Sequence, residues 1–281
     1  LWSKAPNVIV AAKTASPLII GLGEGENFLA SGVPAFLAYT RKAVHLEDGE
    51  MAVLKRDGVS FFNLAGKKLE KSPITISWDS KMAEKDGYRH FMLKEIYDQP
   101  MSCEDTMRGR FFPLKGVLER DCGMNADILK SVRSIHMIAC GTAYHACLVG
   151  KYWLETLVGI PVHVETASEF RYRETTVNKD DLVIAVSQSG ETADTMAAVK
   201  QAKEKGAKIL AICNTVGSGL TRAADWTLYS HCGPELGVAS TKAFIGQLTS
   251  LAIITLHAAI GRGAMTETQG RAFIEDLVKV P

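Results

Sequence analysis

The chain lacks three features that would assign it to a class at once: a surplus of one charge, paired cysteines, and a long uninterrupted apolar run. Lys and Arg number 32 against 31 Asp and Glu, a net charge of +1. Binding nucleic acid requires a positive surplus that neutralises phosphates, so a basic nucleic-acid-binding protein is excluded as the default. The longest apolar stretch, 248–260, is interrupted by Thr, Ser and His. A membrane-spanning helix needs roughly 20 apolar residues, so we expect no membrane segment.

Cysteine and histidine are also too scattered to form the usual bonded or metal-bound frameworks. None of the six cysteines belongs to a C-x-x-C pair, and none of the seven histidines to an H-x-x-x-H pair. Disulfide scaffolds need dense cysteines in small secreted domains, and zinc sites need closely spaced ligands. We therefore expect reduced thiols, as in the cytoplasm, and no metal site.

The two ends of the sequence suggest a piece of a longer protein. The chain begins at Leu1 rather than Met, without the charged and then apolar segment of a signal peptide. Residues 273–279 have a helical pattern that stops short at Pro281. Our interpretation is that the natural protein extends beyond this chain.

The first 70 residues have the pattern of β-structure, and a polar linker and helices follow. A hairpin is predicted where Gly58, expected to adopt a positive φ, separates two apolar runs. Residues 71–87 are polar and irregular, and helices are predicted over 90–98, where Pro100 should stop the helix, and over about 102–119. The predicted β-runs are 8–12, 17–20, 28–31, 44–46 and 51–55.

From residue 134 onward, short apolar strands alternate with helical segments. Continuous apolar strands of this kind favour a parallel sheet covered on both faces. We therefore predict an α/β fold with a five-stranded, doubly wound parallel sheet, whose ligands bind outside the carboxyl ends of the strands. The predicted strands are 135–139, 161–164, 182–186, 208–213 and 226–230.

The most informative motif runs from Ser187 to Thr192 (SQSGET), directly after a predicted strand. Gly190 allows a tight turn in which several backbone N–H groups face one anion. The hydroxyls of Ser187, Ser189 and Thr192 add donors, and the dipole of the following helix favours negative charge. Without the lysine of a triphosphate-binding loop, the motif predicts a phosphomonoester site. The alternative is that these hydroxyls only cap the helix, but capping needs one hydroxyl rather than three.

Two other segments are predicted to reach the same edge of the sheet. After strand 135–139, Gly141 permits close backbone approach, and the Thr142 hydroxyl and Ala143 N–H are candidate donors.

In the segment 235–242, Glu235 is a candidate for bonding sugar hydroxyls, and Ser240 and Thr241 are candidates for capping a long helix. Lys242 is either a ligand or, as is more common for a lone lysine, solvent-exposed.

These motifs, in this order, resemble the SIS (sugar isomerase) domain family, and more closely the family of glutamine:fructose-6-phosphate aminotransferases. The β-rich start is similar to the closing part of that family's N-terminal-nucleophile glutaminase domain, and 88–100 (YRHFMLKEIYDQP) is similar to its linker. The SIS-like motifs are 140–142 (CGT), 167–173 (ASEFRYR), 187–194 (SQSGETAD) and 237–243 (GVASTKA).

The resemblance implies a division of the chain and a set of binding residues. The implied parts are a partial glutaminase domain (1–75), linker helices (76–125), a first SIS domain (126–262) and a connection towards a second (263–281). Val238 is implied to contact the sugar through its backbone, while Ala143, where the family often has serine, has only its N–H to offer. The implied phosphate-binding residues are Ser187, Gln188, Ser189 and Thr192, with Thr142 beside them.

The resemblance also implies a reaction. Ammonia from glutamine converts fructose 6-phosphate to glucosamine 6-phosphate in a cytoplasmic homodimer, without metal or cofactor. The family's nucleophilic cysteine and isomerase acid–base residues have no match here, so we assign no catalytic residue and expect binding without turnover. Two alternatives are a phosphosugar-sensing regulatory module and a stand-alone sugar-phosphate isomerase. A β-rich leading segment argues against both, because such regulators carry a helix-turn-helix there and such isomerases carry no leading module.

Overall fold

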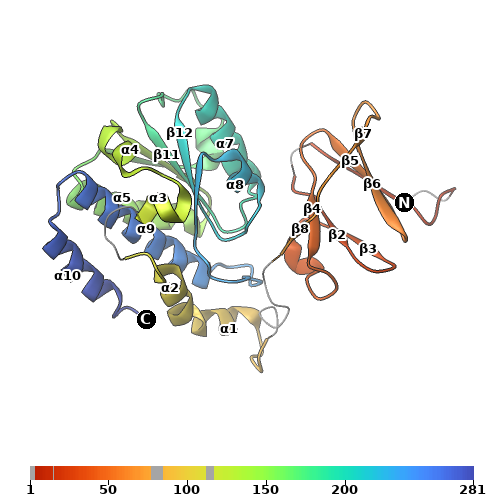
Figure 1. The fold of residues 1–281 in the computed structure, drawn as a ribbon, viewed down its shortest axis with the longest axis horizontal. Helices are drawn as coiled ribbons and strands as arrows, with labels where there is room; N and C mark the ends of the chain where they lie inside the picture. The colour runs from red at the N-terminus through yellow and green to blue at the C-terminus, as the bar shows by residue number, and fades with distance from the viewer. Residues whose placement is uncertain (1–3, 15, 77–84, 112–116) are drawn as a thin grey trace. The chain divides into compact units, whose positions relative to one another are not determined.

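The computed structural model describes residues 4–14, 16–76, 85–111 and 117–281, and it separates the chain into two compact units. The first unit is Leu1–Glu84 and the second is Lys85–Pro281. Each unit is described by itself below (Figure 1). The domain limits implied by the resemblance stay a prediction.

The first unit consists of antiparallel strands in two four-stranded sheets, with orders β1-β5-β6-β7 and β3-β2-β4-β8. The predicted hairpin is confirmed, with Lys55 paired to Gly58. Gly58 is simply the first residue of β6 and is not among the positive-φ glycines, so that detail of the prediction was wrong. The strands are β1 Ile9–Lys13, β2 Ile19–Leu22, β3 Asn27–Ala30, β4 Lys42–His45, β5 Glu50–Lys55, β6 Gly58–Asn63, β7 Lys68–Leu69 and β8 Ile74–Thr75.

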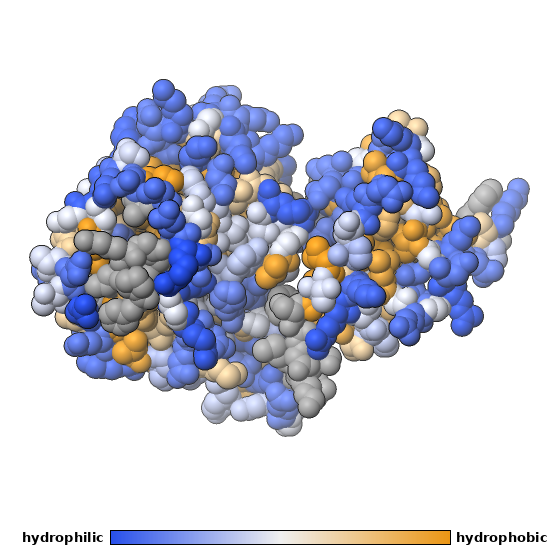
Figure 2. All heavy atoms as spheres, viewed as in Figure 1, coloured by the Kyte–Doolittle hydropathy of each residue, from blue (hydrophilic) through white to orange (hydrophobic). Residues whose placement is uncertain are grey.

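Several large apolar side chains of the first unit are exposed on its surface. Val10, Leu29, Tyr39 and Leu64 are all exposed, and Figure 2 shows apolar surface gathered over this unit.

The second unit is built on a five-stranded parallel sheet with the order β10-β9-β11-β12-β13, which confirms the predicted fold class. The chain starts at β9, adds β10 on one side, and then adds β11 on the other, so the strand order reverses between β9 and β11. In open α/β sheets, such a reversal opens a crevice at the carboxyl edge. The strands are β9 Ile135–Ala139, β10 Val162–Thr166, β11 Leu182–Ser187, β12 Lys208–Cys213 and β13 Trp226–Tyr229.

Helices cover both faces of this sheet because alternate strand residues point to opposite sides. Ile135 and Met137 pack with residues of α5 and α9, whereas Ile138 and Val183 pack with α6, α7 and α8 (Figure 1). The helices are α1 Phe91–Tyr97, α2 Gln99–Met107, α3 Val117–Cys122, α4 Ala126–Ser131, α5 Thr142–Leu157, α6 Ala167–Phe170, α7 Ala193–Glu204, α8 Gly219–Ala223, α9 Lys242–Gly261 and α10 Glu267–Leu277.

The helical region before the sheet differs from the prediction. Pro100 lies in the first turn of α2, where its missing N–H costs nothing, so α2 begins at Gln99 directly after α1. The expected helix over 102–119 is not continuous: α2 ends at Met107, residues 112–116 lie outside the described part, and α3 begins at Val117.

Helix α9 contains the apolar run 248–260, from which we expected no membrane segment. Its 20 residues are long and apolar enough to cross a membrane by length and composition, so length alone does not exclude a membrane span. Most of the helix is buried inside the fold, where it packs against α5 and α2. The core helix of a soluble protein has the same composition.

Candidate functional site

A cavity of about 200 Å³ opens at the carboxyl edge of the parallel sheet, at the strand-order reversal. Ala139 of β9 is paired with Val186 of β11, so the loops that follow these two strands start side by side. The structure brings all seven predicted substrate-binding residues to this cavity. The lining consists of Cys140, Thr142, Ala143, Val186, Ser187, Gln188, Ser189, Thr192, Glu235, Gly237, Val238, Ser240 and Gln247.

The loop from Ser187 to Thr192 is stabilised by its own hydroxyls. Ser187 Oγ accepts a hydrogen bond from Gly190 N at 3.0 Å and lies 3.2 Å from Thr192 Oγ1. Ser189 Oγ accepts from Glu191 N at 3.2 Å. The hydroxyls are therefore held in place along one side of the cavity.

Thr192 is the N-cap residue of α7, but its side chain makes no capping hydrogen bond. The simple capping alternative therefore does not account for this hydroxyl. An acidic residue in the first turn, Asp194, is paired with Arg171 at 2.6 Å, so its charge is offset. The helix dipole gives this end of α7 a positive potential.

Two predicted glycines shape the site without lining it. Gly190 has a φ of +67°, and a Cβ there would collide with the Ser218 hydroxyl and lie 2.7 Å from Cys213 Sγ. Gly141 has a φ of +61° immediately before α5. Both therefore act through the backbone, since other residues adopt a positive φ at a cost.

Glu235 has a role that the sequence did not indicate. Its Oε1 accepts hydrogen bonds from Thr241 N at 2.8 Å and Ala243 N at 3.1 Å, which caps α9. The expectation that Ser240 and Thr241 cap this helix was wrong, because Thr241 makes no side-chain capping bond and Ser240 Oγ has no partner among the described residues.

Lys242 lies outside the cavity lining. Its side chain is buried and its Nζ lies 3.1 Å from Asp98 Oδ2. Lys242 is therefore neither in the cavity lining nor solvent-exposed, contrary to the two alternatives expected from the sequence. It forms a buried ion pair that joins α9 to the α1–α2 junction.

Sequence reasoning missed Gln247, which lines the cavity from the second turn of α9. Its side chain is only 2% exposed, and Oε1 has no hydrogen-bond partner among the described residues. A buried amide in an apolar helix is costly unless it is paired. The sequence does contain a pattern that could have indicated this residue, because Gln247 is the lone amide in the apolar segment 243–254. Cys140, Val186 and Gly237 were also missed.

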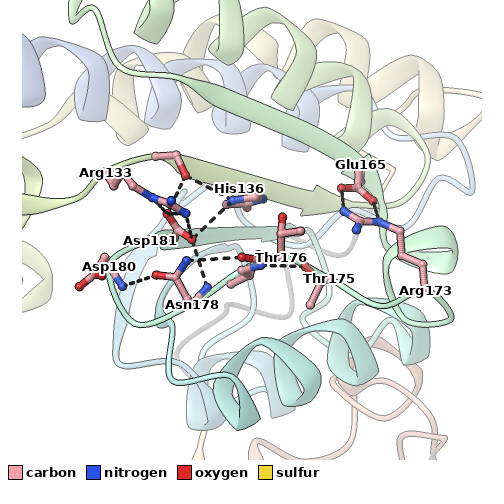
Figure 3. A network of polar contacts seen from close by, with 11 residues as sticks. Arg133, His136, Glu165, Arg173, Thr175, Thr176, Asn178, Asp180 and Asp181 are labelled. Carbon is pink, nitrogen blue, oxygen red and sulfur yellow. Dashed lines mark hydrogen bonds and ion pairs between the residues drawn. The ribbon is translucent and has the colours of Figure 1, made fainter.

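The amino edge of the same sheet holds a polar network in which side chains bind one another (Figure 3). Asp181 is 1% exposed and accepts hydrogen bonds from Ser134 Oγ at 2.7 Å, Asn178 N at 3.1 Å and Arg133 Nη2 at 3.3 Å. Burial is the largest influence and would raise the pKa of Asp181, but the hydrogen bonds from Ser134, Arg133 and Asn178 N, together with the charge of Arg133, lower it overall.

His136 lies in this network beside Asp181 and stacks on His163, with ring centroids 4.8 Å apart. Burial, and then the neighbouring His163, lower the pKa of His136, against the opposing effect of Asp181. Its Nδ1 has no partner among the described residues, so a protonated ring would bury an unpaired donor.

The described residues bring no three His, Cys, Asp or Glu side chains together as a metal site. All six cysteines are free. Burial raises the pKa of the Cys147 and Cys213 thiols, which keeps them protonated.

The comparisons with known proteins agree with this geometry. Residues 128–256, which lie in the second unit, match the family model described as the SIS domain.

Nearly the whole chain is also similar to glutamine–fructose-6-phosphate aminotransferases [isomerizing]. It is 48% identical to that of Caldanaerobacter subterraneus subsp. tengcongensis over 98% of this chain and 45% of the relative. It is 49% identical to that of Aquifex aeolicus over 90% of this chain and 41% of the relative. The chain therefore spans less than half the length of these relatives.

A solved structure points to the same family. The C-terminal domain of glucosamine-fructose-6-phosphate aminotransferase from Francisella tularensis superposes with a TM-score of 0.67 at 38% identity, over 70% of this chain and 55% of that chain. The resemblance seen in the sequence motifs is thus confirmed.

Proposed function

We propose that the cavity binds fructose 6-phosphate, and that this chain supplies the phosphosugar-binding SIS domain of a glutamine-dependent aminotransferase. The observation that carries the proposal is the convergence of three separate loops, with their hydroxyl and amide groups, on one cavity at the strand-order reversal. The small cavity volume of about 200 Å³ suits a ligand the size of a monosaccharide phosphate.

The two ends of the cavity differ in polarity, which orients the ligand. At the α7 end, the hydroxyls of Ser187, Ser189 and Thr192 offer donors beside a helix N-terminus, as a phosphate requires. At the α9 end, the carboxylate of Glu235 already occupies the helix N-terminus. A second anion is disfavoured there, whereas sugar hydroxyls can donate to Gln247 Oε1 and exchange hydrogen bonds with Ser240.

The whole reaction extends this proposal beyond the chain. We propose that the complete protein converts fructose 6-phosphate to glucosamine 6-phosphate with ammonia from glutamine, in a cytoplasmic homodimer without metal or cofactor. The similarity to enzymes of that name supports this. The chain's own contribution is to bind and orient the phosphosugar, so we expect no glucosamine 6-phosphate from the chain alone.

Thr192→Ala tests the proposed site, with Thr176→Ala, an exposed position outside the cavity lining, as the matched control. A charge-assisted hydrogen bond contributes about 1.5–3 kcal/mol, so we expect the Kd for fructose 6-phosphate to rise roughly 10- to 100-fold in calorimetry. The melting temperature should barely change. Ser187→Ala should weaken binding too, but also destabilise the loop, because Ser187 Oγ accepts from Gly190 N. Equal affinity of the Thr192 variant and the unaltered chain would reject the phosphate assignment.

A further inference from the structure

The wall of the cavity opposite the phosphate end is a loop with no helix or strand to hold it. Residues 231–241 form neither, yet this loop supplies Glu235, Gly237, Val238 and Ser240 to the lining. The side chain of Val238 is fully exposed. Because such a loop does not hold its shape by a backbone ladder, other contacts must fix it.

Glu95, in the middle of α1, fixes the middle of this loop, whose start is hydrogen-bonded to Asn214 and whose end is hydrogen-bonded to Glu235. Its side chain is 2% exposed. Oε1 accepts hydrogen bonds from Leu236 N at 2.6 Å and Gly237 N at 3.2 Å, and Oε2 lies 3.1 Å from the same Gly237 N. Hydrogen bonds from N–H groups to a carboxylate are roughly twice as strong as neutral ones. A single carboxylate thus holds the backbone in the middle of the loop.

Gly237 makes this approach possible. A Cβ at position 237 would lie 2.5 Å from Glu95 Oε2 and 3.4 Å from Met92 Cα. The first distance is shorter than real Cβ contacts, so any larger residue has to displace the carboxylate. The glycine is required by space rather than by an unusual backbone angle.

The end of the loop has a second anchor in the same helical region. Lys242 Nζ lies 3.1 Å from Asp98 Oδ2, directly after α1, and Lys94 Nζ lies 3.6 Å from the same oxygen. The segment between Leu236 and Lys242 is therefore fastened at both ends to residues of the α1 region, which lies next to it in Figure 1.

We propose that Glu95 is a positioning residue for the sugar end of the cavity. It does not line the cavity; it acts by holding Gly237 and its neighbours where the ligand's hydroxyl-bearing part meets them. This inference rests on the proposed function. It makes α1, the first helix of the second unit, a structural part of the binding site, so that a shift of α1 moves the loop and changes affinity for the sugar.

The test compares two ligands in Glu95→Ala, Glu95→Gln and a matched control, Asp105→Asn, whose pair with Arg108 is on the surface of α2. Fructose 6-phosphate is titrated by calorimetry and inorganic phosphate by ³¹P NMR. Since the phosphate end is a different loop, Glu95→Ala should weaken fructose 6-phosphate roughly tenfold and leave phosphate binding unchanged. Glu95→Gln, which keeps an acceptor oxygen, should recover part of the loss. The control should match the unaltered chain.

Gly237→Ala alone keeps the test decisive if Glu95→Ala folds poorly by circular dichroism: its Cβ would lie 2.5 Å from Glu95 Oε2, so it should weaken fructose 6-phosphate and leave inorganic phosphate binding unchanged. Where Glu95→Ala folds, the two substitutions are also combined. Gly237→Ala should weaken fructose 6-phosphate in the unaltered background and weaken it less in a Glu95→Ala background, because the clash with Oε2 is then gone. Additive effects would overturn the inference, as would unchanged sugar-phosphate binding in Glu95→Ala or an equal loss for both ligands. Absence of fructose 6-phosphate binding to the unaltered chain would instead overturn the proposed function, and this inference with it.

Discussion

The two edges of the parallel sheet use polar residues in opposite ways. At the amino edge, Asp181 accepts hydrogen bonds from Ser134, Asn178 and Arg133, and is almost completely buried. At the carboxyl edge, Gln247 Oε1 and Ser240 Oγ have no partner among the described residues. At the amino edge the Asp181 carboxylate is fully hydrogen-bonded, although His136 Nδ1 beside it has no partner among the described residues, whereas at the carboxyl edge the unpartnered buried atoms belong to residues that line the cavity.

This contrast separates stability from binding within one sheet. A buried polar group costs free energy unless it is hydrogen-bonded, so the amino edge depends on Asp181, which accepts hydrogen bonds from Ser134 and Asn178. The unpartnered atoms at the carboxyl edge are costly in the empty protein, and under the proposed function a bound sugar phosphate offsets that cost. Substitutions at the amino edge should therefore lower the free energy of unfolding without changing the affinity for fructose 6-phosphate. Substitutions of the residues with unpartnered atoms at the carboxyl edge should lower that affinity without lowering the free energy of unfolding.

The largest expected effect is on stability, from Asp181→Ala. Removing the carboxylate leaves the buried Ser134 hydroxyl and the Asn178 N–H without their acceptor. We expect the free energy of unfolding of the second unit to fall by about 2–4 kcal/mol, measured by urea denaturation, with the affinity for fructose 6-phosphate unchanged. The neighbouring exposed Asp180, changed to Ala, is the matched control and should lose far less. A weaker affinity for fructose 6-phosphate in the folded Asp181 variant would show that the amino edge contributes to binding as well as to stability.

Gln247→Met, at the carboxyl edge, should have a smaller effect, which is a loss of affinity without a loss of stability. The methionine keeps the approximate shape but removes an unpaired buried oxygen, so stability should be unchanged or slightly higher. The Kd for fructose 6-phosphate should rise about three- to tenfold.

Ser250→Ala controls for the general effect of removing an unpaired buried polar atom from α9. Ser250 Oγ also has no partner among the described residues, but Ser250 does not line the cavity. This variant should leave the affinity unchanged. If it weakens sugar-phosphate binding as much as Gln247→Met does, the role assigned to Gln247 is wrong.

The smallest effect concerns pH. The pKa of His136 is lowered in the folded protein, so near the ordinary pKa of about 6.5 the unfolded state binds the proton more readily. The contribution of neutral His136 to the free energy of unfolding is therefore complete above about pH 6.5. It is lost as the pH falls towards the pKa of His136 in the folded protein, by at most about 1.4 kcal/mol per pH unit. In denaturation curves at pH 7.5, 6.5 and 5.5, His136→Gln should flatten this dependence, whereas exposed His90→Gln should not. An unchanged slope in His136→Gln would show that His136 does not carry this dependence.

The parts of the molecule that could be predicted from sequence are those set by local patterns. Apolar runs followed by Gly- and Ser-rich turns indicated β9 and β11 and the turns after them, beside which lie Thr142, the first residue of α5, and Ser187, the last residue of β11. The roles of Glu95 and Lys242 could not be predicted, because their partners are 141 to 144 residues away in the chain. The sequence shows that Glu235 is acidic, but only the fold shows that its carboxylate caps α9.

The most direct test of the account is the rise in melting temperature caused by fructose 6-phosphate in three proteins: the unaltered chain, Asp181→Ala and Thr192→Ala. A ligand that binds only the folded state raises the melting temperature according to its affinity. We predict similar rises in the unaltered chain and in Asp181→Ala, although the latter melts lower, and little or no rise in Thr192→Ala. An undiminished rise in Thr192→Ala, or its loss in Asp181→Ala, would contradict the assignment of binding to the carboxyl edge and stability to the amino edge.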